Sequence, residues 1–431
     1  MKLSRDDSAF AVIVAAVAAA YANALTASFQ FDDWDVIVDQ PRVHSLAAWW
    51  GSMPGIRPLL KLSYALTYSV SSGATAFHLT NVAIHAANAC LVFALLAKRT
   101  TRNVALTAAL IFALHPVQTE AVTYVTGRSC SLSALFVLLA LYVSTVDIPQ
   151  WLSPTFFSCA LLVKETALMA AVPIFLRKRG LSPFLVAAGA VGVALASPVY
   201  RHLLAVSLRT RGIGTNLMTQ AHAVVYLIGQ LVRFDRLNAD PKLPVIDALG
   251  FGVAADAALV VALIVAGFAL VKKHPEAGFA SLWFFLWLVP TNSFLPRLDV
   301  ANDRQLYLAL AGPAFLVAHA LNAVTKQRTG LFVALVAVLC AGLVTATHVR
   351  NRVYADEITF WSDVAAKSPS NGRAFNNLGY ALALEQRNQD AETAFLRALV
   401  IDPGYVKAAV NLRLLREGAL IPRPGALGHR P

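Results

Sequence analysis

Three carboxylates follow the first long apolar segment of the chain: Asp32, Asp33 and Asp35. Charged groups at the end of a membrane helix cost free energy unless they face water, a partner or a reacting group. A carboxylate held there can act as the general base that removes the proton of an acceptor hydroxyl. Asp33 and Asp35 could alternatively hold a divalent cation through oxygen ligands. We prefer a reaction without a metal and expect no cofactor, because the chain has cations that could neutralise a leaving group.

Basic side chains at the ends of other apolar segments indicate what would leave in such a reaction. Arginine offers bidentate hydrogen bonds to phosphate, and lysine offers a point charge. A cluster of these cations beside a carboxylate favours transfer from a lipid-anchored phosphate ester. We expect the phosphate to be bound by Arg57, Arg128, Lys164 and Arg304, with His78, His115, Glu120 and Glu165 on the same outer face.

The composition places these residues in a membrane protein. Of the 431 residues, 57% are hydrophobic and only 14% are charged, whereas soluble domains carry about 25% charged residues. The net charge of +12 does not indicate nucleic-acid binding, because the basic residues stand in short clusters between apolar segments. Such clusters are typical of cytoplasmic loops.

The apolar segments predict an all-α membrane domain over residues 1–347 with about eleven spans. A straight span needs roughly 20 residues, so the shorter Pro154–Val163 and Thr166–Leu176 are expected to form a tilted or broken pair. Residues 28–75 are expected to form an extended first outer loop, and residues 207–248 a second outer or re-entrant segment. If residues 217–232 crossed the membrane, the later basic clusters would fall on the wrong side. The expected helices are Ser8–Ala27, Phe77–Ala97, Val104–Leu114, Ser131–Thr145, Pro154–Val163, Thr166–Leu176, Pro183–Leu204, Leu249–Val271, Gly278–Val289, Gln305–Val324 and Leu331–Thr347.

A polar sequence begins after His348 and predicts a helical module over residues 348–420. It matches the tetratricopeptide (TPR) repeat, which is about 34 residues long, at Phe375, Leu378, Gly379, Leu382, Ala391, Phe395, Ala398 and Pro403. Because so few repeats do not stand alone, we expect the module to pack on the membrane domain. It would bind an acceptor polypeptide, through Asn376, Asn377 and Tyr380, or serve as a structural lid. Residues 421–431 predict a disordered tail.

Several short motifs occur in an order that resembles a known family. The chain is similar to the transmembrane, TPR-bearing O-mannosyltransferases of the GT-C superfamily, and more distantly to the protein O-mannosyltransferases. The ordered set is specific, although no single motif is. The motifs are Phe31-Asp32-Asp33, Arg57-Pro58-Leu59, Phe77-His78 with Asn81 and His85, Leu114-His115-Pro116 with Glu120, Gly127-Arg128, Lys164-Glu165 and Asp303-Arg304 with Tyr307.

The resemblance implies a GT-C fold and inverting transfer of a single sugar, expected to be mannose, from a polyprenyl phosphate to a protein hydroxyl. It implies that Asp32 is the base, with Asp33 as the second choice, and that Arg128 contacts the donor phosphate. The family's acidic residue after this arginine is missing here, because the sequence continues Ser129-Cys130. The short repeat array and compact loops suggest a bacterial inner-membrane protein with a periplasmic module.

Two other functions remain open at this point. A GT-C enzyme could instead modify a glycolipid of the lipid A type or a polysaccharide, although a TPR surface favours a polypeptide. A non-catalytic membrane scaffold that displays the TPR module is the second alternative, but it leaves the acids and arginines unexplained.

Overall fold

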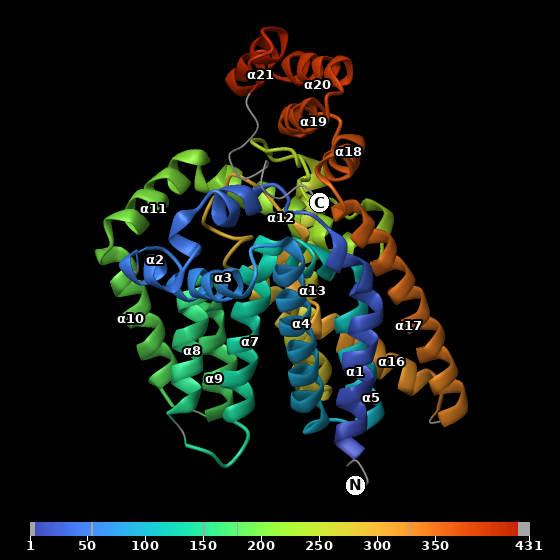
Figure 1. Cartoon of the computed structure of the whole chain (residues 1–431). Helices are drawn as coiled ribbons and strands as arrows, with labels where there is room; N and C mark the ends of the chain where they lie inside the picture. Colours follow the sequence, from blue (N-terminus) through green and yellow to red (C-terminus); the bar gives the residue numbers. More distant parts are fainter. Residues whose placement is uncertain (1–4, 53–54, 150, 179, 327, 421–431) are drawn as a thin grey trace.

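The computed structural model describes residues 5–52, 55–149, 151–178, 180–326 and 328–420. These residues form helices and connecting segments without a β-strand, which confirms the predicted all-α class. A bundle of long helices makes up the larger part, and helices α18–α21 stand on one end of it (Figure 1). We call this end the module end and the opposite one the N-terminal end. The predicted disordered tail, residues 421–431, lies outside the described residues.

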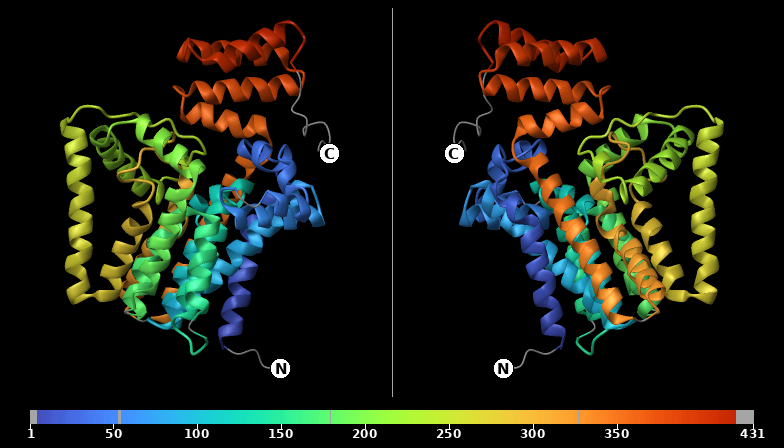
Figure 2. Two further views of the ribbon diagram at one scale, coloured as in Figure 1. Left: turned by 90° about the vertical axis from the view of Figure 1, so that its left-hand side faces the viewer. Right: turned by 90° about the vertical axis from the view of Figure 1, so that its right-hand side faces the viewer.

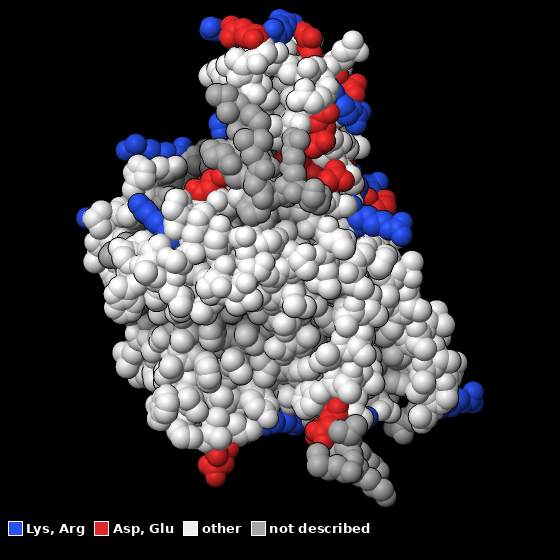
Figure 3. Space-filling view, viewed as in Figure 1, with Lys and Arg blue, Asp and Glu red and all other residues white. Residues whose placement is uncertain are grey.

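Five of the described helices are long and apolar enough to cross a membrane, or up to eight spans if three bent helix pairs count as one each. Charged side chains gather at the two ends and leave an uncharged band between them in the view of Figure 3. The chain is therefore a multi-pass membrane protein, and the predicted number of spans is not confirmed. The bundle helices are α1 (Arg5–Tyr21), α4 (Ala74–Ala97), α5 (Arg102–Leu114), α6 (Thr119–Val122), α7 (Arg128–Val143), α8 (Leu152–Val163), α9 (Ala171–Lys178), α10 (Ser182–Ala196), α13 (Phe251–Lys273), α14 (Pro275–Leu288), α15 (Leu306–Ala309), α16 (Ala311–Val324) and α17 (Thr329–Asn351).

The basic clusters lie together at the N-terminal end. The turns between α4 and α5, α13 and α14, and α16 and α17 are all at this end (Figures 1 and 2). Lys98 donates a hydrogen bond to Thr145 Oγ1 at 2.8 Å, and Arg102 donates one to Ser8 Oγ at 2.9 Å. Because basic loops favour the cytoplasmic side, we expect the module end to face outward.

The first outer loop is folded into short helices, so the expectation of an extended loop is wrong. Pro58 opens α3, where its fixed φ suits the first helical position, and Leu60 and Tyr64 are buried on the bundle side. This loop forms a cap on the module end. Its elements are η2 (Trp34–Val38), η3 (Pro41–Val43), α2 (Leu46–Gly51) and α3 (Pro58–Val70).

The expected single span Pro183–Leu204 is also wrong. The helix breaks at Ser197 into α10 and α11 (Pro198–Thr210), which are bent by 87°. Ser197 is extended, with φ −73° and ψ 122°, because a following proline disfavours helical backbone at the preceding residue. Helix α11 therefore turns across the module end and does not continue α10 through the bundle (Figure 1).

Helix α12 (Ile213–Gln230) lies within the predicted second outer segment. Asn216 donates to the Ser293 carbonyl and Gln220 to the Val300 carbonyl, and both acceptors lie in the loop after α14. These contacts hold α12 close to the module end. Helix α12 is not among the described helices that are apolar enough to be candidate spans. Its contacts do not require residues 217–232 to cross the membrane.

The module consists of α18 (Glu357–Lys367), α19 (Gly372–Leu384), α20 (Asn388–Ile401) and α21 (Val406–Arg416), stacked in sequence order (Figure 2). Gly379 lets α19 and α20 approach, since a Cβ there would stand 2.8 Å from the ring of Phe395. Paired helices of this kind are what a TPR requires, and the assignment to that repeat class stays a prediction.

The module packs on the bundle through α18 and the turn that follows it. Trp361 shares an apolar cluster with Ala27 at the end of the first membrane helix and with Tyr124 after α6. Lys367 Nζ donates to the Leu237 carbonyl at 2.8 Å. The module therefore rests directly on the segments that form the module end of the bundle.

We expect Gly127→Ala to destabilise the whole module end. A Cβ at Gly127 would stand 2.2 Å from the Glu120 carbonyl oxygen and 2.9 Å from Ala121 Cα, and backbone atoms cannot move aside cheaply. Forced overpacking costs about 1–3 kcal/mol. Thermal unfolding in detergent should show the loss. The matched control is Gly192→Ala in α10, where no atom lies within 4 Å of the added Cβ, and equal melting temperatures for the two variants would contradict the expectation.

Candidate active site

Asp33 joins the first outer loop to the turn after α6. Its side chain is fully buried, and its two carboxylate oxygens accept hydrogen bonds from the backbone N–H of Gln30 at 2.9 Å and of Thr126 at 2.8 Å. Burial raises the pKa of Asp33 to about 7, and the two amide donors oppose that rise. Because both oxygens are engaged with backbone, Asp33 has a structural role in this arrangement.

Asp32 differs from its neighbour because no backbone amide holds its carboxylate. It is partly exposed, its own N–H donates to the Tyr124 hydroxyl at 3.0 Å, and its carboxylate lies in the field of Arg304 and Arg373. Burial raises the pKa of Asp32, while the Arg304 charge opposes the rise. Of the two candidate bases, Asp32 is the one whose carboxylate is accessible to a substrate.

Phe31 gives this segment its unusual path. Its φ of 45° is in the left-handed region, which costs a residue with a side chain about 1–3 kcal/mol. The ring lies 5.1 Å from that of Trp361, edge to face, and 5.6 Å from the Arg373 guanidinium. These contacts with the module stabilise the strained backbone immediately before the acids.

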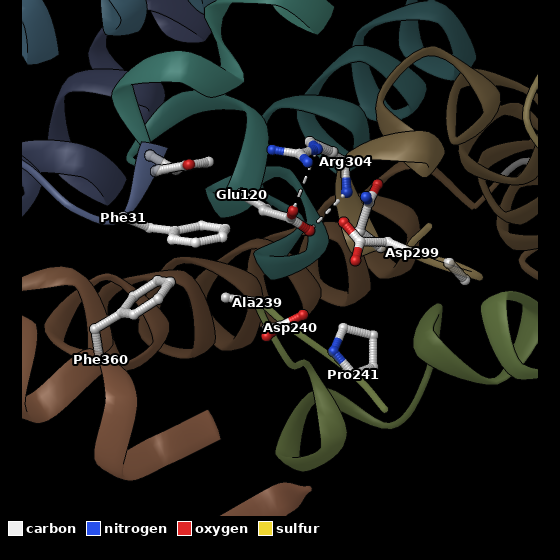
Figure 4. Close-up of a pocket in the computed structure, with 11 residues that line it drawn as sticks. Phe31, Glu120, Ala239, Asp240, Pro241, Asp299, Arg304 and Phe360 are labelled. Atoms are coloured by element: carbon white, nitrogen blue, oxygen red, sulfur yellow. Dashed lines mark hydrogen bonds and ion pairs between the residues drawn. The ribbon is translucent and has the colours of Figure 1, made fainter. Parts of the chain in front are cut away.

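Glu120 and Arg304 form the floor of a polar pocket beside these residues. The backbone N–H of Arg304 donates to Glu120 Oε2 at 2.9 Å, and Arg304 Nε lies 3.5 Å from Glu120 Oε1. Figure 4 shows this pair facing Asp299, with Phe31 and Phe360 on the opposite wall. The void is small, about 10 Å³. Its walls are Phe31, Glu120, Tyr124, Ala239, Asp240, Pro241, Asp299, Ala301, Asn302, Arg304 and Phe360.

Arg373 of α19 binds two carboxylates that line this pocket. Its guanidinium donates to both carboxylate oxygens of Asp240 and, at 2.8 Å, to Asp299. Asn371 Nδ2 also donates to Asp240 Oδ2 at 2.9 Å. Burial alone would raise the pKa of Asp299, but Arg373 brings it below the ordinary value. Arg373 of the module thus links two loops of the bundle, one carrying Asp240 and the other Asp299.

The predicted phosphate ligands fall into different environments. Arg57 is neutralised by Glu165, with Nη2 and Oε2 2.8 Å apart, and Tyr200 donates to the same carboxylate. Lys164 Nζ donates to Cys130 Sγ at 2.8 Å. Burial lowers the pKa of Lys164, and the nearby charges of Arg57 and Arg304 lower it further. Arg57 and Arg304 each already have a carboxylate partner, whereas Lys164 has only the Cys130 sulfur among the described residues.

Arg128 is fully buried and holds helices together. It donates to the Asn81 side-chain oxygen at 2.6 Å, to the Ser63 carbonyl and Thr67 hydroxyl at 3.0 Å each, and to the Phe77 carbonyl at 3.1 Å. These acceptors belong to α3 and α4, and they replace the carboxylate that the sequence lacks. Arg128 does not line the pocket, so its predicted contact with the donor phosphate finds no support in this geometry.

The remaining predicted site residues are bonded to backbone or lie apart from the pocket. His78 Nε2 is 3.0 Å from the Ala27 carbonyl, and His115 Nδ1 accepts the N–H of Val117. Asp35 is exposed, so Asp33 and Asp35 do not face a common space. Among the described residues, no three His, Cys, Asp or Glu side chains gather at a distance suited to a metal ion.

The predicted acceptor-binding residues of the module are partly used within it. Asn376 is buried, accepts a hydrogen bond from Asn411 of α21 and donates one to Asn377, both at 3.0 Å. Tyr380 is partly buried in the apolar cluster between α19 and α20. Of these two asparagines, Asn377 is therefore the one more accessible to a polypeptide on this surface.

Sequence reasoning missed two carboxylates that line the pocket, Asp240 and Asp299. It also missed Arg373, which binds both of them, and Arg297, whose charge acts on Asp299. Arg297 is partly exposed, and its guanidinium has no hydrogen bond or ion pair with the other described residues. Burial lowers its pKa, and the charge of Arg304 lowers it further. The pattern Arg297-Leu-Asp299 shortly before Asp303-Arg304 was the available signal for two of them. Nothing local marks Asp240 or Arg373.

Together, these features define a multi-pass membrane protein with an acid- and arginine-lined pocket under a helical module. Comparison with known proteins confirms the resemblance to membrane O-mannosyltransferases. The mouse protein O-mannosyl-transferase TMTC3 is 24% identical over 93% of this chain, the human one 25% over 93%, and one from Caenorhabditis elegans 25% over 89%.

The chain spans 52% of the mouse and human proteins and 61% of the nematode protein, so it covers about half the length of these curated relatives. No protein-family model and no solved structure matches the chain. The similarity is thus to named enzymes along nearly the whole chain, and the GT-C fold itself stays an expectation.

We expect Asp33→Ala to lower stability strongly. The change leaves the N–H groups of Gln30 and Thr126 without their acceptor, at a cost of about 1–3 kcal/mol for each unpaired buried group. Asp35→Ala, at an exposed carboxylate only two positions away, is the control and should unfold like the wild type. A normal melting temperature for Asp33→Ala would show that the loop is held by other contacts.

We expect Arg373→Ala to release the loop that carries Asp240. This carboxylate is buried and would lose its main partner, and a buried charge without a partner is destabilising. Hydrogen exchange of backbone amides 237–242 should become faster. Arg387→Ala, which breaks an exposed pair with Asp390, should leave those amides unchanged. Unaltered exchange in Arg373→Ala would show that Arg373 does not hold the loop that carries Asp240.

Proposed function

We propose that this protein is a membrane glycosyltransferase that moves one sugar, mannose, from a polyprenyl phosphate to hydroxyl groups of extracytoplasmic proteins. The observation that carries the proposal is the accessible carboxylate of Asp32, which lies in the field of Arg304 and Arg373 and directly follows Phe31 in the pocket wall. The relatives' names, protein O-mannosyl-transferase, support the sugar and the class of acceptor. The location at the module end supports chemistry outside the cytoplasm.

In the proposed reaction, Asp32 takes the proton of the acceptor hydroxyl while the hydroxyl oxygen attacks C1 of the sugar. The bond between C1 and the phosphate oxygen breaks, and its electron pair leaves with the polyprenyl phosphate. Attack from the face opposite the phosphate inverts the configuration at C1. In this proposal, Lys164, Arg304 and Arg297 stabilise the leaving phosphate, because preorganised cations act strongly where charge develops.

The proposal needs neither a metal nor another cofactor, because the cations can balance a monophosphate leaving group. The lipid part of the donor would reach the site from the surrounding bilayer, and the module would bind the acceptor protein. We place the enzyme in a bacterial inner membrane with the module in the periplasm. Nucleic acid has no role in this reaction.

Intact-mass spectrometry of envelope proteins, from cells with and without the gene, tests the proposal. Loss of one hexose from a discrete set of proteins is the expected result. Altered lipid or polysaccharide mass with unchanged proteins would instead establish a glycolipid transferase. No change in any fraction would favour a scaffold and contradict the proposal.

We expect Asp32→Asn to abolish transfer without changing the melting temperature, since no structural hydrogen bond of the carboxylate to backbone is lost. A base must be ionised to act, and the pKa of Asp32 is raised. The wild-type rate should therefore fall as pH drops through a pKa above the ordinary carboxyl value of about 3.9. Asp35→Asn should keep both the rate and the pH profile. Full activity in Asp32→Asn would disprove the assignment of the base.

A further inference from the structure

Asn302 presents an unused amide to the pocket. The residue is 3% exposed, lines the pocket and stands directly before η8 (Asp303–Gln305). Neither Nδ2 nor Oδ1 has a hydrogen-bond partner among the described residues. An asparagine at this position normally accepts a backbone N–H of the helix that follows, yet the Asn302 side chain forms no such bond.

This unpaired state has an energetic cost. A buried polar group without a partner costs about 1–3 kcal/mol, and most such groups are paired. Asn292, also buried in the same loop, donates to Gln220 at 2.8 Å and accepts from the Thr291 hydroxyl at 2.8 Å. The amide of Gln305 in η8 is unpaired like that of Asn302, but Gln305 does not line the pocket. The amide of Asn302 is therefore available for a ligand that enters the pocket.

The walls of the pocket suit a pyranose ring. The rings of Phe31, Tyr124 and Phe360 offer apolar surfaces to the C–H faces of a sugar, and the carboxylates of Asp240 and Asp299 offer acceptors. A side-chain amide combines a donor and an acceptor, which matches two neighbouring hydroxyls, each able to donate and accept.

The position of Asn302 favours the donor sugar over the acceptor polypeptide. It lies two residues before Arg304, one of the cations placed to bind the donor phosphate, whereas the module covers the side from which a polypeptide would arrive. Resting on the proposed function, we propose that Asn302 hydrogen-bonds two hydroxyls of the transferred sugar and determines which hexose is accepted.

Entry of the sugar requires the pocket to widen. A void of about 10 Å³ holds roughly one water molecule. The wall formed by Ala239, Asp240 and Pro241 is tied to the module, because Asp240 is held by Arg373 and Asn371. Widening of the pocket on this side would require release of Asp240 from these two residues.

The test uses the full chain in lipid nanodiscs with polyprenyl-phosphate mannose and polyprenyl-phosphate glucose as probes. Asn302→Ala should raise the KM for the preferred donor at least tenfold, reduce the preference between the two hexoses at least tenfold, and leave the KM for the acceptor unchanged. Asn302→Asp, which keeps an acceptor but loses the donor, should also alter the preference. Asn292→Ala is the matched control and should keep the preference even if its stability is lower.

Three results would overturn the inference. A raised KM for the acceptor alone would assign the amide to the polypeptide, and unchanged constants would leave it without a role in recognition. A second readout does not need turnover: the preferred donor should raise the melting temperature of the wild type but not of Asn302→Ala. If the wild type binds a donor but does not transfer its sugar, the proposed function fails, and the melting temperatures still report on the role of Asn302. Equal stabilisation of the wild type and Asn302→Ala by the donor would refute that role.

Discussion

The candidate active site depends on a buried carboxylate that joins two distant parts of the backbone. Asp33 accepts one N–H from its own loop and one from Thr126, after α6. This pair of hydrogen bonds fixes the first outer loop against the turn that also carries Tyr124, whose hydroxyl accepts the N–H of Asp32. The geometry of the accessible acid is therefore set by the buried one beside it. Two adjacent aspartates differ because the side chain of Asp33 is fully buried and that of Asp32 is partly exposed.

The arginines, like the two aspartates, differ in their roles. Arg128 has no carboxylate partner and is held by carbonyl, hydroxyl and amide oxygens from two neighbouring helices. Such an arrangement can hold a buried guanidinium rigidly, because its five donors have fixed directions. Arg304 and Arg297 keep part of their charge available near the pocket. Positive charge thus serves as a structural link inside the bundle, and in the proposed function it binds the donor phosphate at the module end.

Much of the architecture was predictable from local sequence. The lengths of the apolar segments predicted the long helices, and the basic clusters predicted which end of the bundle faces the cytoplasm. The acids after the first helix predicted the position of the candidate site. The break at Ser197 was also signalled, since a proline follows it, but uninterrupted apolarity favoured one long helix. The separate roles of Asp32 and Asp33 were not predictable, because they depend on which side chain meets the Thr126 amide. Asp240, Asp299 and Arg373 come from three distant segments, and only the folded chain brings them together.

The change in composition after His348 suggests that the module begins there. The apolar cluster at the base of the module places the boundary between bundle and module further along the chain, after α18. Tyr354, Phe360 and Trp361 pack in one cluster with Ala27 and Tyr124 of the bundle. In packing terms, α18 therefore belongs to the bundle, and the separable part of the module begins at α19. Foreign repeats joined after α19, with Arg373 retained, would leave the contacts of α18 and the Asp240–Asp299 link intact.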